Sequence, residues 1–171
     1  MNDKTESGIN DQAADISDPC LYRSAFEHAG VGMVLLDSAG RFVSVNPEAC
    51  RLWGYTQSEL IGMSFRDITY ADDLEDSAEN VERLLRGEVD SFSMEKRYVR
   101  KDGQLMWAQV FVAVIGPTRA RPESRQDDGA ASRRRSEPVY VVAEFHDITC
   151  LKETETALAR ETDLLNALMD T

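Results

Sequence analysis

The sequence is poor in the side chains that most often bind metal ions or act as catalytic nucleophiles. Its 171 residues include only 3 cysteines and 2 histidines. Cys20, Cys50 and Cys150 are far apart and form no CxxC pair, which argues against a disulfide framework and against a zinc site. His28 and His146 stand at opposite ends of the predicted fold, and no glycine-rich phosphate loop or nucleophile elbow is present. We therefore expect no metal site and no enzymatic activity in this chain.

Long apolar runs and a surplus of positive charge are also missing. No run approaches the ~18 apolar residues that a membrane-spanning helix needs. The polar start, MNDKTESGINDQAADISD, lacks the basic and apolar parts of a signal peptide. The formal net charge of −12 argues against nucleic-acid binding, because that relies on cationic contacts to phosphate. The sequence predicts a cytoplasmic domain with no nucleic-acid partner and no membrane contact by these residues.

Two stretches contain almost no large apolar side chains, so they cannot contribute to a core. Residues 1–18 are polar and acidic, and we predict a disordered lead-in there. Residues 117–137 hold six arginines and four acidic residues, and we predict a disordered insertion between the last two strands. The triplet Arg133–Arg135 leaves open a contact with an acidic partner or nucleic acid, but a solvated insertion is the default interpretation. These boundaries leave one domain over 19–149 and a linker helix over 150–171.

The stretch Val31–Asn46 has the pattern of a β-hairpin that leads into a helix. Two β-prone runs flank the segment 37–40, Asp-Ser-Ala-Gly, in which glycine can take the positive φ of a tight turn. The first run is apolar on both parities, so we expect both of its faces to be buried. Asn46 followed by a proline predicts a capped helix over 47–53.

Short helices with their own start and stop signals surround this hairpin. Apolar spacing and capping patterns predict helices over 19–29 and 71–86, and short turns over 56–61 and 65–70. The helix over 71–86 is the most regular, and its predicted apolar stripe consists of Leu74, Ala78, Val81 and Leu85. Four acidic residues crowd its first turn, where they complement the helix dipole. They lack the EF-hand pattern of a calcium site.

Three β-rich segments complete the domain, over 91–100, 105–115 and 138–146. The first two are joined by the hairpin turn Lys-Asp-Gly-Gln at 101–104. Side chains alternate between the two faces of a strand, so Glu95 and Arg97 share one face of the first segment. We interpret them as a structural ion pair.

From Thr149 onward the pattern is helical. Leu151, Leu158 and Leu165 fall seven residues apart, as in the apolar seam of a coiled coil, although other seam positions are polar. The apolar surface at the end of this helix is too large to remain exposed to water. Three arrangements remain open: pairing with a second copy, packing back on the sheet, or continuation into a further domain.

In this order the elements resemble the PAS sensory domain of bacterial signal-transduction proteins. GMVLLDSAGRFVSVNPEACRLWGYTQSELIGMSFRDI is similar to the first half of that family, and MEKRYVRKDGQLMWAQVFVAVI is similar to the second. The structural and signalling positions of the motif fall on Asn46, Asp102, Gly103, Asp147, Ile148 and Thr149. The resemblance implies an α+β fold: a five-stranded antiparallel sheet in the order 2-1-5-4-3, with short helices over one face and flanking helices at both ends.

A sheet cupped by helices encloses a pocket, which is where PAS domains hold ligands. Matching strand parities to the family gives nine ligand-pocket candidates: Val34, Leu36, Tyr98, Met106, Ala108, Val110, Val112, Ala143 and Phe145. Trp107, Phe111 and Val142 then lie on the opposite face, which we expect the N-terminal helix or a second copy to cover. With Leu151, Leu158 and Leu165 they form the expected dimer or helix-docking face.

The resemblance also bears on cofactors. The photosensory flavin-binding members carry Gly-x-Asn-Cys where this chain has Gly62-Met63-Ser64-Phe65, so no cysteinyl flavin adduct can form. The long helix has no histidine for a haem, and Tyr70-Ala71 stand where the family often has His-Pro. We expect no cofactor. A pocket filled by its own side chains is favoured over a small apolar ligand or a non-covalent flavin.

The resemblance implies a non-catalytic sensor and dimerisation module. A ligand or partner would shift the sheet, and the Asp-Ile-Thr junction at 147–149 would pass that change to the exit helix. Expected partners are a second copy, and a downstream effector in the same chain, such as a histidine kinase or a cyclic-di-GMP enzyme. A second PAS domain is also expected, because ETDLLNALMDT resembles the first helix of one. A ligand-free protein-interaction module is the alternative.

Overall fold

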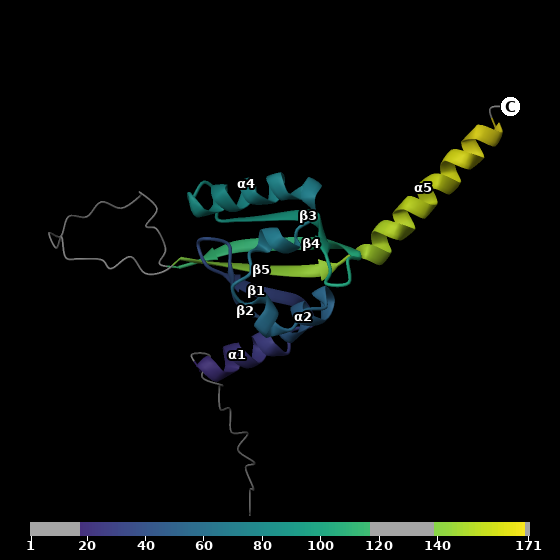
Figure 1. The fold of residues 1–171 in the computed structure, drawn as a ribbon. Coiled ribbons are helices and arrows are strands. Elements are labelled where there is room, and N and C mark those ends of the chain that lie inside the picture. The colour runs from purple at the N-terminus through teal and green to yellow at the C-terminus, as the bar shows by residue number, and fades with distance from the viewer. Residues whose placement is uncertain (1–17, 117–138, 170–171) are drawn as a thin grey trace, which may run out of the picture.

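The computed structural model describes residues 18–116 and 139–169. Apart from Asp18, the predicted lead-in and the predicted arginine-rich insertion lie outside the described residues. Five strands form one antiparallel sheet: β1 (Gly32–Leu36), β2 (Phe42–Val45), β3 (Ser91–Val99), β4 (Leu105–Ile115) and β5 (Tyr140–Asp147). Their order, β2-β1-β5-β4-β3, confirms the predicted sheet (Figure 1).

The hairpin between β1 and β2 forms as the sequence predicts. The Asp37 carboxylate accepts hydrogen bonds from the backbone N–H groups of Ala39 and Arg41, both at 2.9 Å. Gly40 has a φ of 76°, and a Cβ atom there would stand 2.7 Å from the Phe65 ring, so both conformation and space require glycine. The expected burial on both faces of β1 is wrong in part, because only its inward side chains are fully buried; Met33 and Leu35 are half-buried.

Seven helical pieces accompany the sheet among the described residues: α1 (Pro19–Glu27), α2 (Pro47–Trp53), α3 (Gln57–Leu60), η1 (Phe65–Ile68), η2 (Ala71–Asp73), α4 (Leu74–Leu85) and α5 (Thr149–Met169). The segment from α2 to α4 carries the chain from one sheet edge, β2, to the other, β3. It packs over the inner face, with α2 against β1 and α4 against β3 and β4.

The predicted stripe of α4 is displaced. The fully buried residues of this helix are Ser77 and Leu84, while Val81 and Leu85 are half-buried. Apolar periodicity could not place a serine at the centre of the buried face. Ser77 turns inward because its hydroxyl accepts a 2.9 Å hydrogen bond from the buried Lys96 ammonium of β3.

An aromatic cluster forms the centre of the core. The Trp53 ring, at the end of α2, stacks on Phe145 of β5 with 4.4 Å between centroids and 11° between planes. Tyr98 of β3 and Phe42 of β2 lie 5.1 Å and 5.5 Å from the same indole. One helix thus joins strands from both halves of the sheet, because each contributes an aromatic ring.

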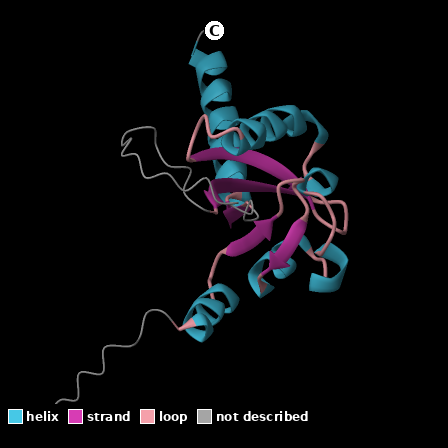
Figure 2. Ribbon diagram, turned by 90° about the vertical axis from the view of Figure 1, so that its left-hand side faces the viewer, coloured by secondary structure: helices cyan, strands magenta, loops and turns pink. Residues whose placement is uncertain are grey.

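The two terminal helices leave the outer face of the sheet uncovered. The C-terminal part of α1 lies beside β2 and α2, where the Phe26 carbonyl accepts a hydrogen bond from Asn46. Helix α5 extends away from the sheet (Figure 1 and Figure 2). The expected cover by the N-terminal helix is therefore wrong, and so is the arrangement in which the exit helix packs back on the sheet.

Candidate functional site

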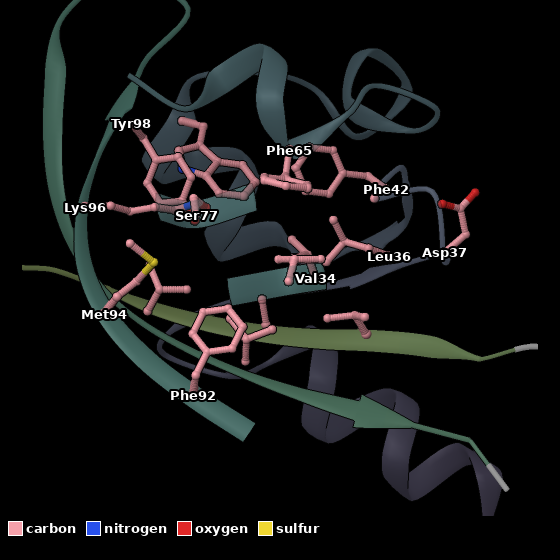
Figure 3. A pocket seen from close by; sticks show the side chains of 17 residues that line it. Val34, Leu36, Asp37, Phe42, Phe65, Ser77, Phe92, Met94, Lys96 and Tyr98 are labelled. Carbon is pink, nitrogen blue, oxygen red and sulfur yellow. The ribbon is translucent and has the colours of Figure 1, made fainter. Parts of the chain in front are cut away.

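A small cavity lies between the inner face of the sheet and the helices (Figure 3). All five strands contribute to its walls, together with the β1–β2 turn, α2, η1 and α4. Of the nine residues predicted to face a pocket, six line this cavity: Val34, Leu36, Tyr98, Val110, Val112 and Ala143. The other three, Met106, Ala108 and Phe145, are also buried, but they pack in the core beside the cavity and do not line it.

The cavity volume is about 30 Å³. A cavity needs roughly 10–15 Å³ to admit one water molecule, whereas sites for drug-sized ligands occupy roughly 300–1,000 Å³. The cavity therefore has room for a water molecule or two, and a flavin does not fit it as it stands. Phe92, Met94 and Val81 are only half-buried and form its more exposed side, so a larger ligand would have to move these side chains.

The cavity is also lined by residues that the sequence analysis did not place there, and Lys96 is the most important of them for its chemistry. The Lys96 side chain is 4% exposed and lines the cavity (Figure 3). Nζ donates hydrogen bonds to Ser77 Oγ at 2.9 Å and to Thr69 Oγ1 at 3.3 Å, and lies 4.6 Å from the centroid of the Tyr98 ring. Burial lowers the pKa of Lys96 to about 7, although the Asp73 carboxylate opposes this shift. Lys96 has the same strand parity as Tyr98, and this parity could have predicted that its side chain faces the cavity.

No carboxylate of the described residues forms an ion pair with Lys96. Asp73 is engaged by Arg97, which donates to it from Nη2 at 2.6 Å and from Nε at 3.0 Å. Asp37 also lines the cavity, but its carboxylate serves the β1–β2 turn and is turned away from the cavity (Figure 3). A buried ammonium without a counter-ion is costly, so such groups concentrate at functional sites.

Another residue that lines the cavity, Trp53, has a polar group without a hydrogen-bond partner. The Trp53 indole Nε1 is buried and finds no hydrogen-bond acceptor among the described residues. Burial also raises the pKa of Tyr98 above its usual value, so this phenol stays neutral. The cavity therefore combines largely apolar walls with the Lys96 ammonium, and one of its lining residues, Trp53, has an indole N–H without an acceptor.

Two ion pairs flank Lys96 on the other face of β3. Arg97 pairs with Asp73, at the start of α4, and its guanidinium lies 4.3 Å from the Tyr70 ring centroid. Glu95 pairs with Lys152 of α5 at 2.5 Å. The predicted pair between Glu95 and Arg97 is therefore wrong, because each side chain finds a closer partner on another element. Asp72 also lies near the Arg97 guanidinium, at 3.7 Å. No group of three potential metal ligands occurs in the part of the chain that the structure describes.

The Asp-Ile-Thr junction fastens the start of α5 to the sheet. The Asp147 carboxylate accepts from the Thr149 N–H at 2.9 Å and pairs with Arg100 of the β3–β4 turn at 2.7 Å. The Thr149 hydroxyl in turn accepts from the backbone N–H of Trp107 at 3.0 Å, and the Ile148 N–H donates to the Trp107 carbonyl at 2.9 Å. These bonds connect the exit helix directly to β4.

Two other motif positions have local structural roles. The Asn46 side chain is fully buried, and its oxygen accepts from the N–H groups of Met33 and Ala49, both at 2.9 Å. Its amide group donates to the carbonyls of Phe26 and Val31. Asp102 accepts from the backbone of the β3–β4 turn, in which Gly103 has a φ of 85°.

The outer face of the sheet and α5 carry the exposed apolar side chains. Phe111 is 44% exposed on β4, while Trp107 and Val142 are half-buried beside it. On α5, three leucines at heptad spacing are exposed: Leu151, Leu158 and Leu165. No helix of the described residues has the length and apolar character to cross a membrane.

Comparisons with known proteins agree with this architecture. A family model described as the PAS fold matches residues 42–125. The probable diguanylate cyclase DgcE of Escherichia coli (strain K12) is 34% identical over 134 residues, which are 78% of this chain and 11% of that protein. The sensor histidine kinase TmoS of Ectopseudomonas mendocina is 26% identical over 137 residues, which are 80% of this chain and 12% of that protein. The chain thus spans about a tenth of the length of these relatives.

A solved structure shows the same fold. The PAS domain of a protein from Colwellia psychrerythraea superposes with a TM-score of 0.60 at 20% identity, covering 77% of this chain and 98% of that one. The sheet order, the family match and the two signalling relatives lead to one conclusion: this chain belongs to the PAS family, as a sensory domain.

Proposed function

We propose that this chain is a non-catalytic sensor and dimerisation module, which relays the state of its pocket to an effector through α5. One observation carries the proposal. Lys96 faces the cavity, while the preceding residue, Glu95, holds Lys152 of the exit helix. Consecutive residues of a strand point to opposite faces of the sheet, so a shift of β3 at Lys96 also moves the Glu95 carboxylate.

The exposed leucines of α5 support the dimerisation part. Leu151, Leu158 and Leu165 are 53%, 64% and 55% exposed, and their heptad spacing suits a parallel pair of helices. On the outer sheet face, the Trp107 ring lies 5.6 Å from Lys152 Nζ at the root of α5, and Phe111 lies further along the same strand; both would extend the same interface. A second copy is thus the proposed cover of both surfaces.

The two signalling relatives support the effector part. A diguanylate cyclase and a sensor histidine kinase both contain a segment like this chain as about a tenth of their length. We place a catalytic output domain of one of these kinds, or a further PAS domain, beyond α5. A cytoplasmic location agrees with the free thiols of Cys20, Cys50 and Cys150, which persist in reducing compartments.

The relay is tested by coupling between the pocket and the exit helix. Lys96→Met changes the pocket without touching α5, and hydrogen exchange measures how it affects the first hydrogen-bonded amides of α5, residues 152–155. We expect a several-fold change in exchange rate, which Glu95→Gln abolishes in the double variant.

Glu155→Gln is the matched control for this experiment. It also removes a carboxylate near Lys152 Nζ, at 3.4 Å, but that carboxylate belongs to α5 itself. The effect of Lys96→Met should therefore persist in the Glu155→Gln background. Unchanged exchange at 152–155, or an equal change with and without Glu95, would show that no relay runs through this pair.

One observation favours a second function, a protein-interaction module that binds no ligand. The cavity volume of about 30 Å³ is small, so the core is almost completely filled by its own side chains, as protein cores normally are. In that case a partner on the outer sheet face would supply the signal. Exchange at α5 would then respond to substitutions at Phe111 and not to substitutions at Lys96.

A further inference from the structure

We propose that the pocket binds a small monocarboxylate with a compact apolar body, whose carboxylate pairs with the Lys96 ammonium. This inference rests on the proposed sensor function and names the class of ligand that the sensor would bind. Trp53 also lines this cavity, and its buried indole N–H has no acceptor among the described residues.

The hydrogen-bonding capacity of Lys96 leaves a place for an acceptor. An ammonium group has three N–H donors. Ser77 Oγ and Thr69 Oγ1 accept from Nζ, and both belong to neutral hydroxyls. Neither hydroxyl compensates a buried positive charge. A carboxylate would occupy the third position and supply the missing charge at once, through a charge-assisted hydrogen bond.

The remaining walls limit what else the ligand can carry. Apart from Lys96, Asp37 and Ser77, the described lining is apolar or aromatic, and it contains no arginine. A phosphate or a dicarboxylate would bring a second negative charge that no cation of this lining meets, and an unpaired buried charge is strongly unfavourable. One negative charge on an apolar body is therefore the chemistry that the walls match.

The size of the cavity favours a compact ligand. The existing volume of about 30 Å³ must grow to hold even a branched four-carbon acid. Phe92 and Met94 line the more exposed side, and methionine adapts readily because its side chain is unbranched and flexible. Their displacement would open the space next to Lys96, and it would couple binding to the position of β3.

The test uses isobutyrate and its neutral isostere isobutyramide with the chain 1–171. Isothermal titration gives affinities, and ¹³C NMR of lysine labelled at Cε follows the Lys96 signal. We expect isobutyrate to bind at least about tenfold more tightly than isobutyramide, as a charge-assisted contact predicts. We also expect the pKa of Lys96 to rise in the isobutyrate complex, because the carboxylate favours the charged ammonium.

Two substitutions make the test specific. Lys96→Met keeps an unbranched apolar stem but removes the ammonium, and we expect it to erase the preference for isobutyrate. Lys101→Met removes an exposed lysine outside the cavity and should leave the preference unchanged. Thermal unfolding of both variants checks that they fold.

Several results would overturn the inference: no isobutyrate binding, equal affinity for both compounds, or a preference that survives in Lys96→Met. None of these results bears on the relay between Glu95 and Lys152, which is tested without any ligand. A failure of the ligand class is therefore distinguishable from a failure of the sensor role.

Discussion

Lys96 Nζ donates a 2.9 Å hydrogen bond to Ser77 Oγ, and this bond joins the edge strand β3 to α4 inside the core. Both side chains are almost completely buried. The bond gives each of the two polar groups a partner but leaves the charge of the ammonium uncompensated. The core thus tolerates a destabilising group on the wall of the cavity, where the proposed ligand would compensate its charge.

The first prediction concerns the pH dependence of this cost. The pKa of Lys96 is lowered from 10.5 to about 7 in the folded protein, so between these values the unfolded chain binds more protons at this residue. Stability therefore rises with pH across that window. Below it, Lys96 is charged in both states and its burial cost is fully present.

Urea unfolding of wild type and Lys96→Met at about pH 6 and about pH 10 measures this dependence. We expect Lys96→Met to be the more stable protein at the lower pH, with a gain that shrinks at the higher pH. Lys101→Met controls for the removal of an exposed lysine. A gain that is constant with pH would contradict the lowered pKa of Lys96.

The second prediction concerns the pair that holds the start of α4. Asp73 accepts three hydrogen bonds from Arg97, one of them from its backbone N–H at 2.7 Å, and both side chains are less than a quarter exposed. Asp73→Asn should lower the free energy of unfolding by about 1–3 kcal/mol at neutral pH. Asp72→Asn is the matched control, because Asp72 is 72% exposed and 3.7 Å from the same guanidinium, and it should cost less than about 1 kcal/mol.

The pH dependence of the same variants gives a further check. The hydrogen bonds from Arg97 lower the pKa of Asp73, so this carboxylate stabilises the folded state above its unfolded pKa, near 3.8. That contribution is lost as the pH falls through the lowered folded value. The difference between wild type and Asp73→Asn should shrink on acidification below this point. Equal losses for Asp72→Asn and Asp73→Asn at neutral pH would contradict the assigned pairing.

The third prediction concerns the exit helix. Sedimentation velocity over a range of concentrations should show a dimer of the wild-type chain, because pairing buries the exposed leucine seam of α5. Leu158→Asp places a charge in that seam and should shift the chain to monomer. Ala159→Asp adds the same charge one residue along the helix, outside the seam, and should leave the dimer intact. A wild-type monomer at all concentrations, or equal effects of both variants, would argue against this interface.

Local and periodic features of the fold could be predicted from the sequence. The alternation of β4, matched to the family pattern, placed Met106, Ala108, Val110 and Val112 inward and Trp107 and Phe111 outward, as observed, because side chains of a strand alternate strictly. The start of α2 was equally predictable. An asparagine before a proline satisfies the first backbone N–H groups of a helix from within the same few residues, and Asn46 does so.

The partners of charged and polar side chains required the tertiary structure. Parity alone paired Glu95 with Arg97, whereas their partners, Lys152 and Asp73, stand 57 and 24 residues away along the chain. A lysine and a serine are usually exposed, so the sequence argued against burying Lys96 and Ser77. They are buried because the chain brings β3 and α4 together, and each then satisfies the other.

The sequence by itself determined the sheet, its order and its inner face, because apolar period and turn chemistry act over a few residues and together match one family pattern. Only the tertiary structure decided the size of the cavity, its buried cation and the contacts at the root of α5. Those features depend on the distances between side chains from different elements, which periodicity does not specify.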